Sequence, residues 1–532
     1  MKSSYKLIAC IFAAALTLQG CVKDYVKIIP QEEDQAAVLE DDVTKTLKAV
    51  EGVIDVQKVM VKDNDGKDVA NYFFYYSQPM DHADPQKGTF YQQVAMQLSE
   101  PSAPVIVHTQ GYAMEMKGSG AYSNDLCTTL GANWVEIEHR YFGNSQPEPK
   151  DSVQMTYLYT AQAASDIHRV VEMLRTNLFK SNKWVATGVS KGGITAGLQA
   201  YYSDKYGWKD FDLYVPFCAP YLAGTPASPS DVSVGKYIVY SCGNGYDQGS
   251  AEYKAYFRVQ KILQQAVTKP RLRNALLRKF HISEPDNYKK VLDFYGPREM
   301  YALCVALDSH MESLLGFYSA YDFSKWAPLV PDPDLIKNGP EDGTTDDAQA
   351  IAAVCDYFFM TSDDLGEKLQ GAQGPETKAT HTEQDMIRTR ASDKDMPYGV
   401  QSVRELGCVG IDYSWIPKDA FISESLALMV ADKVCSRARA WDFYEGQWDG
   451  GKLMTDFRKW VYTENTQKIV FVYGGNDPWT GGAIDNEAAE ANANVVKIMN
   501  PGGTHTDDFL QPDKYTAEAT KEIKDAVSAF LR

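Results

Sequence analysis

Apolar runs of strand length occur in two separate parts of the chain. The first part begins with a strand-like alternation of apolar and polar positions at residues 53–61, 72–76 and 91–98. Nearly continuous apolar runs, typical of strands buried in a central parallel sheet, follow at residues 105–112, 134–138, 184–186, 213–217, 468–473 and 494–499. Helix-period segments at 161–174 and 194–202 predict helices that cross over such a sheet. The pattern indicates the α/β class.

The segment between about residues 225 and 460 lacks this strand rhythm. It contains helix-compatible stretches rich in Tyr, Trp and Leu at 251–267, 271–279, 300–317 and 348–358. A chain of 532 residues exceeds the size at which one core usually keeps growing. We therefore expect a mainly helical cap (225–460) inserted into a discontinuous α/β domain made of residues 51–224 and 461–532.

The N-terminus carries a targeting pattern. Lys2 and Lys6 precede an apolar run at 7–18 that ends in Leu-Gln-Gly-Cys at 18–21. The run is too short for a membrane span, so residues 1–20 are interpreted as a signal peptide. Leu-Gln-Gly-Cys resembles the lipobox of bacterial lipoproteins, in which Cys21 is acylated; an ordinary secretory signal is the alternative. We expect residues 21–50 to tether an exported protein of the bacterial cell envelope, held at the membrane by its lipid alone.

The charge and the cysteines narrow the class further. Loss of Lys2 and Lys6 with the signal changes the formal charge from −18 to −20, which argues against nucleic acid and anionic lipid as partners. Seven cysteines remain beyond Cys21, and none of them shows the C-x-x-C spacing of a zinc or redox site. The sequence assigns neither a disulfide pairing nor an oligomeric state. The acidic turn at 63–66 resembles half of a calcium loop, but Lys67 stands where an oxygen ligand is required, so we expect a hairpin and no metal site.

One strand-to-helix turn carries the candidate chemistry. Gly188, Ser190 and Gly192 fit G-x-S-x-G, the nucleophile elbow of α/β-hydrolases, in which flanking glycines expose the serine hydroxyl. A glycine-rich turn of this kind can also bind phosphate, or it can simply connect a strand to a helix without a functional role. The apolar strand before it and the apolar helix after it favour the elbow, and a Walker loop would need the lysine before the serine.

An acid and a histidine follow in the order that this fold requires. Asp477 comes just after the run at 468–473, and His505 comes just after the run at 494–499. In a Ser-His-Asp triad, His505 would take the proton of Ser190 and Asp477 would orient the imidazole. The backbone N–H groups of Lys191 and Tyr112 are the candidate oxyanion donors. His168 is expected on a helix surface, and the chemistry needs neither metal nor organic cofactor.

Five motifs in order carry a family resemblance. They are Gln-Pro-Met-Asp-His with Gly-Thr-Phe (78–82 and 88–90), Glu-His-Arg-Tyr-Phe-Gly (138–143), Gly-Val-Ser-Lys-Gly-Gly (188–193), Gly-Gly-Asn-Asp-Pro-Trp (474–479) and Gly-Thr-His (503–505). From about residue 50 onward the chain resembles the secreted prolyl tri- and tetrapeptidyl aminopeptidases, a sister family of the lysosomal prolyl carboxypeptidases and dipeptidyl peptidases. The resemblance implies an α/β-hydrolase fold and a serine exopeptidase that removes short peptides from free N-termini, often after proline. It carries over Ser190, Asp477 and His505.

An enzyme of this type must pair the substrate's ammonium with an acid in a closed end of its cleft. Glu138 and Glu115 are the candidates, and each has the alternative of being a structural or solvated carboxylate. Two other functions stay open. A carboxylic ester hydrolase would use the same scaffold, and a catalytically silent surface lipoprotein would bind peptide or glycan through the cap; an intact triad argues against the latter.

Overall fold

The structure is a computed structural model of the whole chain. The residues that it describes are 41–63, 66–114, 116, 125–147, 154–221, 254, 258, 261–262, 265–266, 269–283, 330–337, 347–359, 396–407, 447–475, 477–501, 503, 505 and 515–532. Residues 1–40, which hold the expected signal peptide and Cys21, lie outside the described residues.

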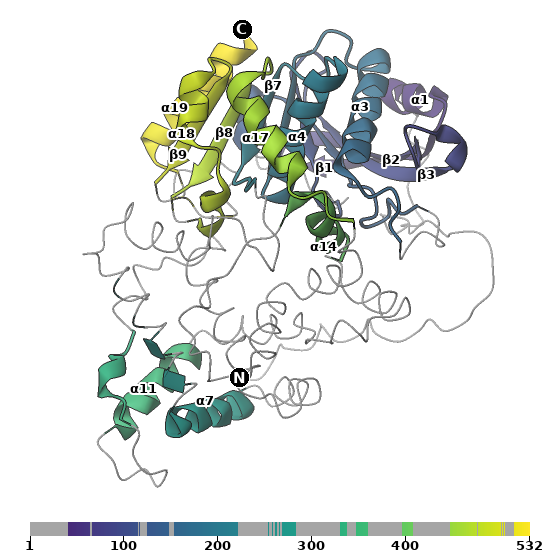
Figure 1. Cartoon of the computed structure of the whole chain (residues 1–532). Coiled ribbons are helices and arrows are strands. Elements are labelled where there is room, and N and C mark those ends of the chain that lie inside the picture. The colour runs from purple at the N-terminus through teal and green to yellow at the C-terminus, as the bar shows by residue number, and fades with distance from the viewer. Residues whose placement is uncertain are drawn as a thin grey trace, which may run out of the picture.

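The described residues build one nine-stranded sheet in the order β1-β2-β3-β5-β4-β6-β7-β8-β9 (Figure 1). The strands are β1 (Val53–Lys62), β2 (Asp68–Pro79), β3 (Thr89–Leu98), β4 (Val105–Thr109), β5 (Asn133–Ile137), β6 (Trp184–Val189), β7 (Leu213–Phe217), β8 (Ile469–Gly474) and β9 (Val495–Asn500). The first three strands run antiparallel, and the six from β5 to β9 pair in parallel. The crossover from β5 through β4 to β6 is the strand order of the α/β-hydrolase fold, which confirms the predicted fold class.

The described helices and turns are bounded as follows. They are α1 (Asp42–Ala49), α2 (Asp125–Leu130), α3 (Thr160–Asn177), α4 (Lys191–Tyr206), α7 (Pro270–Ser283), α11 (Ala348–Phe359), α14 (Met396–Gln401), α17 (Lys452–Thr463), α18 (Asn486–Ala491) and α19 (Ala517–Leu531), with the short 3₁₀ helices η1 (Pro85–Lys87), η5 (Pro333–Leu335) and η9 (Pro478–Gly482) and the π-helix η7 (Ser402–Leu406).

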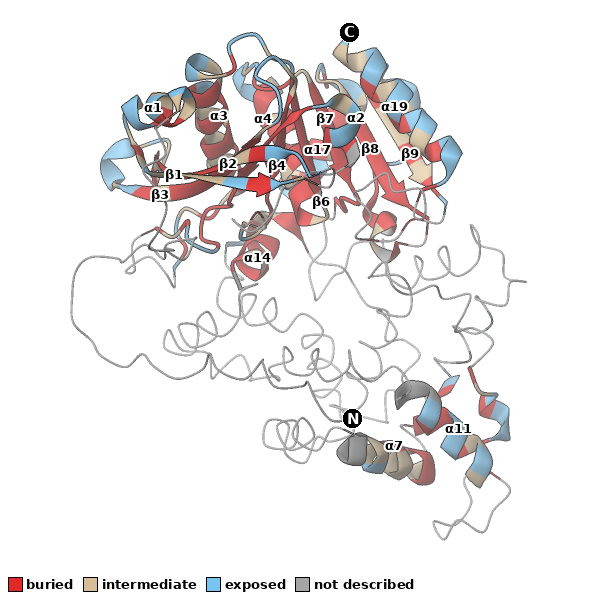
Figure 2. Cartoon of the chain, turned by 180° about the vertical axis from the view of Figure 1, so that it is seen from behind, coloured by how far each residue is buried: buried red, intermediate tan, exposed pale blue. Residues whose placement is uncertain are grey.

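Helices cover both faces of the sheet. Apolar side chains of α1, α3, α4, α17 and α18 share one core with the sheet, and those of α2 and α19 share a second core on the opposite face. Adjacent strand residues alternate between the two cores: Val105 and Val107 belong to the first, and Ile106 to the second. Because both faces are covered, the parallel strands are buried along most of their length, and the partly exposed positions lie in the edge strand β9 and at Val189 at the end of β6 (Figure 2).

The folded domain begins earlier than the sequence predicted. Residues 42–49, which we expected in the tether, form α1, whose N-terminus is capped by the side chain of Asp41. Asp41 also accepts a hydrogen bond from Tyr72 on β2 and pairs with Lys58 on β1, while Leu47 is fully buried. A helix that buries an apolar face against the sheet belongs to the domain, so the boundary at 51 is placed too late.

The predicted end of the cap at residue 460 is also too late. Helix α17 packs on the same face of the sheet as α3 and α4. Its Phe457 stacks on Tyr221 with 4.4 Å between ring centroids, and its Trp460 donates a hydrogen bond to Asp204 of α4. The amphipathic pattern of residues 452–463 is typical of any helix, and it does not report which domain buries the apolar face.

The described parts of the expected cap are helical. Helices α7 and α11 coincide with two of the predicted stretches, 271–279 and 348–358, and they lie together at a distance from the sheet in Figure 1. The predicted stretch at 300–317 and most of 251–267 lie outside the described residues. The cap as a domain therefore stays a prediction.

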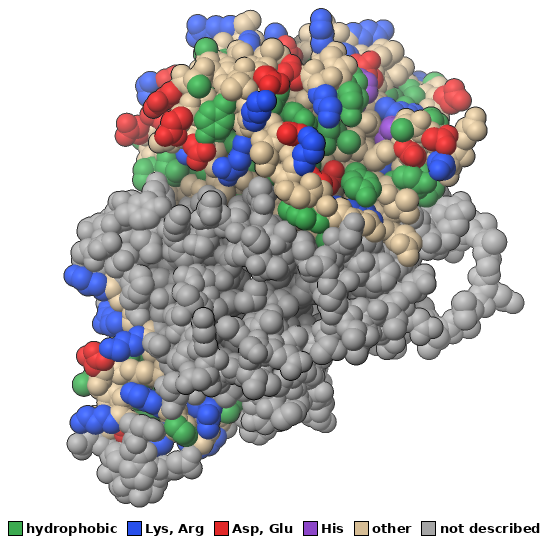
Figure 3. All heavy atoms as spheres, in the orientation of Figure 1, with side chains coloured by type: hydrophobic (Ala, Val, Ile, Leu, Met, Phe, Trp, Pro, Cys, Tyr) green, Lys and Arg blue, Asp and Glu red, His purple; other side chains and the backbone are tan. Residues whose placement is uncertain are grey.

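Three further properties of the described residues bear on the sequence analysis. On the face of the sheet domain seen in Figure 3, basic and acidic side chains are interspersed among the described residues, without a basic patch. Three cysteines of the described chain, Cys127, Cys218 and Cys355, are buried. Of the helices in these ranges, none combines the length and the apolar character that crossing a bilayer would require.

Candidate active site

Ser190 lies in a sharp turn between β6 and α4. Its backbone has φ 54° and ψ −118°, a conformation that residues with a side chain rarely adopt. The turn is held by the Ser190 N–H, which donates to the carbonyl of Phe217 on the neighbouring strand at 2.9 Å. A strained, half-buried serine between a buried strand and a helix is the geometry of a nucleophile elbow, as the motif predicted.

The glycines of this turn are required by close packing of the backbone. A Cβ atom on Gly188 would lie 2.5 Å from the carbonyl carbon and oxygen of Gly192, and one on Gly192 would lie 2.9 Å from the carbonyl of Thr109. The Thr109 hydroxyl fastens the same region by donating to the carbonyl of Gly192 at 3.0 Å. The first turn of α4 can therefore approach β4 and β6 only because both positions lack a side chain.

The structure brings Ser190, His505 and Asp477 into one hydrogen-bonded line. The His505 Nε2 atom lies 2.8 Å from Ser190 Oγ, and His505 Nδ1 lies 2.9 Å from Asp477 Oδ1. Asp477 is fully buried, and His505 is 4% exposed. With Nδ1–H donated to the carboxylate, Nε2 is the acceptor that faces the serine hydroxyl, which is the arrangement needed for proton removal.

Three strand ends converge to produce this line. Ser190 follows β6, Asp477 follows β8, and His505 follows β9, so all three lie at the carboxyl edge of the parallel sheet. Asp477 also caps η9, because its Oδ1 accepts the N–H of Trp479 at 2.7 Å. The carboxylate is thereby fixed before it meets the histidine.

The loop after β4 packs directly against the start of α4. A Cβ atom on Gly111 would lie 2.7 Å from the backbone nitrogen of Gly192. The carbonyl of the next residue, Tyr112, accepts a hydrogen bond from the N–H of His139 at 3.1 Å. Lys191 and Tyr112, the two predicted oxyanion donors, are thus neighbours across this contact, and their role stays a prediction.

Glu138 does not have the surroundings of a substrate site. It is 2% exposed, and its oxygens accept the N–H groups of Met114, Asn144 and Ser145 at 2.8–2.9 Å and the Ser145 hydroxyl at 2.7 Å. Burial raises the pKa of Glu138, and these donors oppose that rise. These contacts favour a structural role for Glu138, in which the carboxylate ties two loops together, over the predicted role as the partner of the substrate's ammonium. Glu115 lies outside the described residues.

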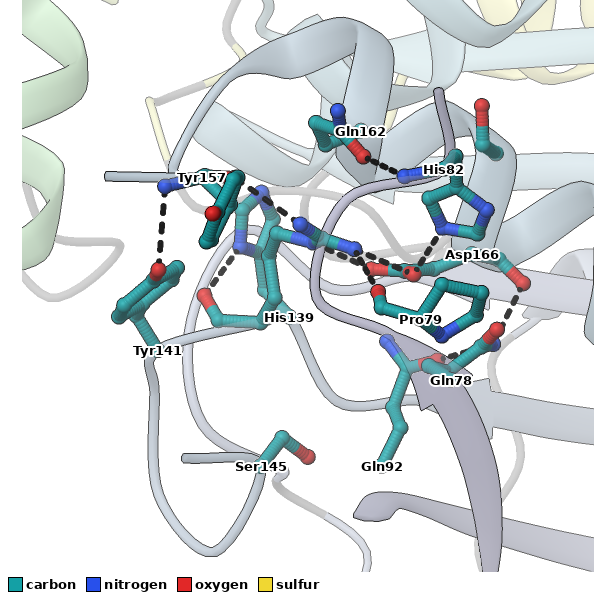
Figure 4. Close-up of polar contacts among 12 residues, drawn as sticks. Gln78, Pro79, His82, Gln92, His139, Tyr141, Ser145, Tyr157, Gln162 and Asp166 are labelled. Carbon is teal, nitrogen blue, oxygen red and sulfur yellow. Dashed lines mark hydrogen bonds and ion pairs between the residues drawn. The ribbon is translucent and has the colours of Figure 1, made fainter. Parts of the chain in front are cut away.

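The motifs around Pro79 and Arg140 form a buried ion cluster that the sequence analysis did not interpret (Figure 4). Arg140 binds the Asp166 carboxylate through two bonds of 2.6 and 2.7 Å and donates to the carbonyls of Met80 and Pro79. His82 Nε2 lies 2.7 Å from the same carboxylate. Burial acts to raise the pKa of Asp166, but Arg140 and His82 outweigh it and lower that pKa. The cluster joins the end of β2, α3 and the loop after β5.

His168 lies on α3, as predicted, and serves packing. Its ring stacks on Trp208 with 4.2 Å between centroids, and its Nδ1 lies 2.7 Å from Asp210. With Glu172 these residues bring three potential metal-ligand atoms within 4.8 Å of one another. The existing bond between His168 and Asp210 already uses two of the three, so the cluster is accounted for as a structural contact.

Comparisons with known proteins point to peptidases. Residues 45–228 match the family model described as PS-10 peptidase S37. A prolyl tri/tetrapeptidyl aminopeptidase from Streptomyces mobaraensis is 24% identical over 459 residues, covering 84% of this chain and 78% of the relative.

Solved structures of hydrolases also match over most of the chain. A peroxisomal alpha-beta-hydrolase from Saccharomyces cerevisiae has 10% identity and a TM-score of 0.33, covering 87% of this chain and 89% of its own. An alpha/beta fold family hydrolase from Bacillus anthracis has 12% identity and a TM-score of 0.31, covering 90% and 98%. The fold assignment itself rests on the strand order. Together with that fold, the match of residues 45–228 to the S37 model and the long alignment support a serine peptidase that is similar to the S37 peptidases.

Proposed function

We propose that this protein is an exopeptidase of the aminopeptidase type, which releases short peptides from free N-termini with a preference for proline. The observation that carries the proposal is the hydrogen-bonded line from Ser190 through His505 to Asp477 at the elbow. The exopeptidase mode and the proline preference are supported by the likeness to the Streptomyces mobaraensis enzyme, whose name states both properties.

The proposed reaction is acyl transfer through Ser190. Ser190 Oγ attacks the carbonyl carbon of the scissile bond while His505 Nε2 takes the hydroxyl proton. The carbon–nitrogen bond then breaks, and the leaving amine receives that proton, which leaves an ester on Ser190. Water, deprotonated by His505, attacks this ester, and the released Ser190 oxygen regains the proton. The N–H groups of Lys191 and Tyr112 would bind the oxyanion in both halves.

Selection of a free N-terminus requires an acid that the ammonium can reach. Because the Glu138 carboxylate already accepts hydrogen bonds from four internal donors, Glu115 is the remaining candidate from the sequence analysis. We keep Glu115 as the proposed ammonium partner.

Export and acylation at Cys21 are likewise proposed from the N-terminal pattern. The full-length protein expressed in a bacterial host should therefore incorporate radiolabelled palmitate, and Cys21→Ala should abolish the labelling.

The function is tested by a matched set of substrates. Proline-containing peptides with free and with acetylated N-termini are digested beside short acyl esters, and the products are identified by mass spectrometry. We expect short N-terminal fragments from the free peptides only. Cleavage of esters alone would point to a carboxylic ester hydrolase, and internal cleavage of the acetylated peptides would remove the exopeptidase mode.

Two variants separate catalysis by Ser190 from a silent binding protein. Ser190→Ala should lose all cleavage and all labelling by a fluorophosphonate. Ser165→Ala is the control, because the Ser165 hydroxyl lies on α3 and donates to the carbonyl of Ala161 in the preceding turn of the same helix. Equal activity of the two variants would contradict the proposed nucleophile, and an unlabelled, inactive wild type would favour the binding protein.

A further inference from the structure

The side chain of Lys191 is buried beside the nucleophile. The residue is 1% exposed, and its Nζ atom lies over the rings of Tyr112, Phe142 and Tyr398 at 5.5, 4.9 and 5.8 Å from their centroids. These rings come from the loop after β4, the loop after β5 and α14. The ammonium is therefore enclosed by three segments that are distant in the sequence.

The hydrogen bond that Lys191 makes in this enclosure is to backbone. Its Nζ donates to the carbonyl oxygen of Gly111, and no carboxylate within the described ranges forms an ion pair with it. Burial holds the pKa of the Lys191 ammonium well below its usual value. Burying a lysine without a counter-charge costs stability, so the contact with Gly111 calls for a functional reason.

The carbonyl of Gly111 belongs to the same peptide unit as the N–H of Tyr112. Because a trans peptide is planar, its C=O and N–H point in opposite directions, and the backbone has no cis peptide in the described residues. Fixing the Gly111 oxygen toward Lys191 Nζ thus directs the Tyr112 N–H away from that atom. The other side of Tyr112 is fixed as well, since its own carbonyl accepts the His139 N–H.

Two buried acids hold the rest of this loop. Glu136 accepts hydrogen bonds from the Gln110 side chain at 2.9 Å and from the Met116 N–H at 2.8 Å, and Glu138 accepts the Met114 N–H at 2.9 Å. The loop is therefore bonded on both sides of the peptide that Lys191 engages. Such rigidity matters for an oxyanion donor, which works only if it is aimed before charge develops.

We propose that the side chain of Lys191 is a positioning residue for the oxyanion hole, which it acts on by locking the Gly111–Tyr112 peptide so that the Tyr112 N–H faces the scissile carbonyl. One residue would then supply one donor from its backbone and aim the second with its side chain. This inference rests on the proposed function, since it presupposes acyl transfer at Ser190. It also gives the aromatic enclosure a purpose, which is to keep water from competing for the Gly111 carbonyl.

The test replaces Lys191 by methionine, which fills the aromatic enclosure but cannot donate. We expect kcat to fall by about 100-fold, as for loss of one oxyanion donor, with KM changed by less than about threefold. Lys205→Met is the matched control: Lys205 is also on α4 and lies near three rings, those of Tyr201, Tyr202 and Tyr206, but it is exposed. Its kcat should equal that of the wild type.

A second readout separates positioning from general damage. Lys191→Met should weaken binding of a peptide boronate, which mimics the tetrahedral state, by about the same factor as kcat/KM. In the Ser190→Ala background, the same change should leave the Kd of an uncleaved peptide unaltered. Lys191→Arg, which keeps a donor and has room because a small cavity lined in part by His139, Thr195 and Gln401 adjoins Lys191, should regain at least tenfold of the lost kcat.

The outcomes are distinguishable from failure of the proposed function. An unlabelled wild type, or a Ser190→Ala variant that still cleaves, overturns the function itself. An active wild type whose kcat survives Lys191→Met, or whose KM and kcat change together, overturns the positioning role alone. Should Lys191→Met not fold, a crystal structure of the wild type with the boronate decides: the Tyr112 nitrogen within 3.2 Å of the adduct oxygen supports the inference, and a Gly111 carbonyl turned away from Lys191 refutes it.

Discussion

The imidazole of His505 lies 2.8 Å from the hydroxyl of Ser190, although the two residues are 315 positions apart in the chain. This contact is made between two loops that leave the same edge of the sheet. Asp477 holds the other side of the ring, so the imidazole has one orientation available. The consequences for activity can be tested one residue at a time.

Replacing Asp477 by asparagine should lower kcat by about 10³- to 10⁴-fold while the fold is retained. The amide cannot hold the Nδ1–H tautomer of His505, so Nε2 loses its readiness to accept the serine proton. Steady-state kinetics with circular dichroism measures both effects. Asp485→Asn is the control, since the Asp485 carboxylate accepts a bond from Tyr462 at the surface; a similar kcat for the two variants would rule out Asp477 as the orienting acid.

Replacing Gly188 by alanine should destabilise the protein by about 1–3 kcal/mol or more, because the added methyl group would lie 2.5 Å from the backbone of Gly192. Urea unfolding followed by fluorescence measures the change. Gly207→Ala is the comparison: Gly207 has φ +71° but open space around its Cβ position, so only backbone strain of about 1 kcal/mol is expected. A smaller loss for Gly188→Ala would contradict the packing argument.

Replacing Glu138 by glutamine should reduce stability and leave selectivity unchanged. The amide nitrogen cannot accept the hydrogen bonds now made to one carboxylate oxygen, and unsatisfied buried donors cost about 1–3 kcal/mol each. The ratio of kcat/KM for free and acetylated peptides should stay that of the wild type. A collapse of this ratio with unaltered stability would restore Glu138 as the ammonium site; Glu172→Gln, exposed on α3, is the control.

The contact between η7 and α3 should depend on pH through Glu405. Its carboxylate accepts the Thr160 N–H at 2.7 Å, and burial, with a smaller contribution from Asp449, raises its pKa from 4.5 to about 7 against the opposing effects of Thr160 and Arg404. The folded state therefore holds the proton more tightly than the unfolded state. The stability that this provides is complete below pH 4.5 and is lost as pH rises to about 7.

Glu405→Gln removes this titration. The difference in the free energy of unfolding between variant and wild type should grow in favour of the variant by up to about 3 kcal/mol between pH 4.5 and 7 and stay constant above pH 7. Denaturant unfolding at a series of pH values gives the difference curve. A curve without slope in this interval would show that Glu405 titrates normally.

Much of the fold could be predicted because its signals are local. Strand β7 has the predicted bounds of 213–217, and β6, β8 and β9 lie within a few residues of the predicted runs, since a strand buried on both faces needs continuous apolar side chains. Likewise, the glycines around Ser190 report a steric demand that acts within five residues. The serine, the acid and the histidine could be located because each comes just after a predicted strand, in the chain order that α/β-hydrolases use.

The sequence by itself therefore determined the class of fold, the elbow and the three residues that meet there, because periodicity and turn chemistry are written over short stretches. Only the tertiary structure decided that α1 and α17 belong to the sheet domain, that Glu138 ties loops together, and that Lys191 reaches the Gly111 carbonyl. The physical reason is that the role of a polar or amphipathic residue depends on which donors, acceptors and apolar faces arrive from distant segments, and no local pattern records that meeting.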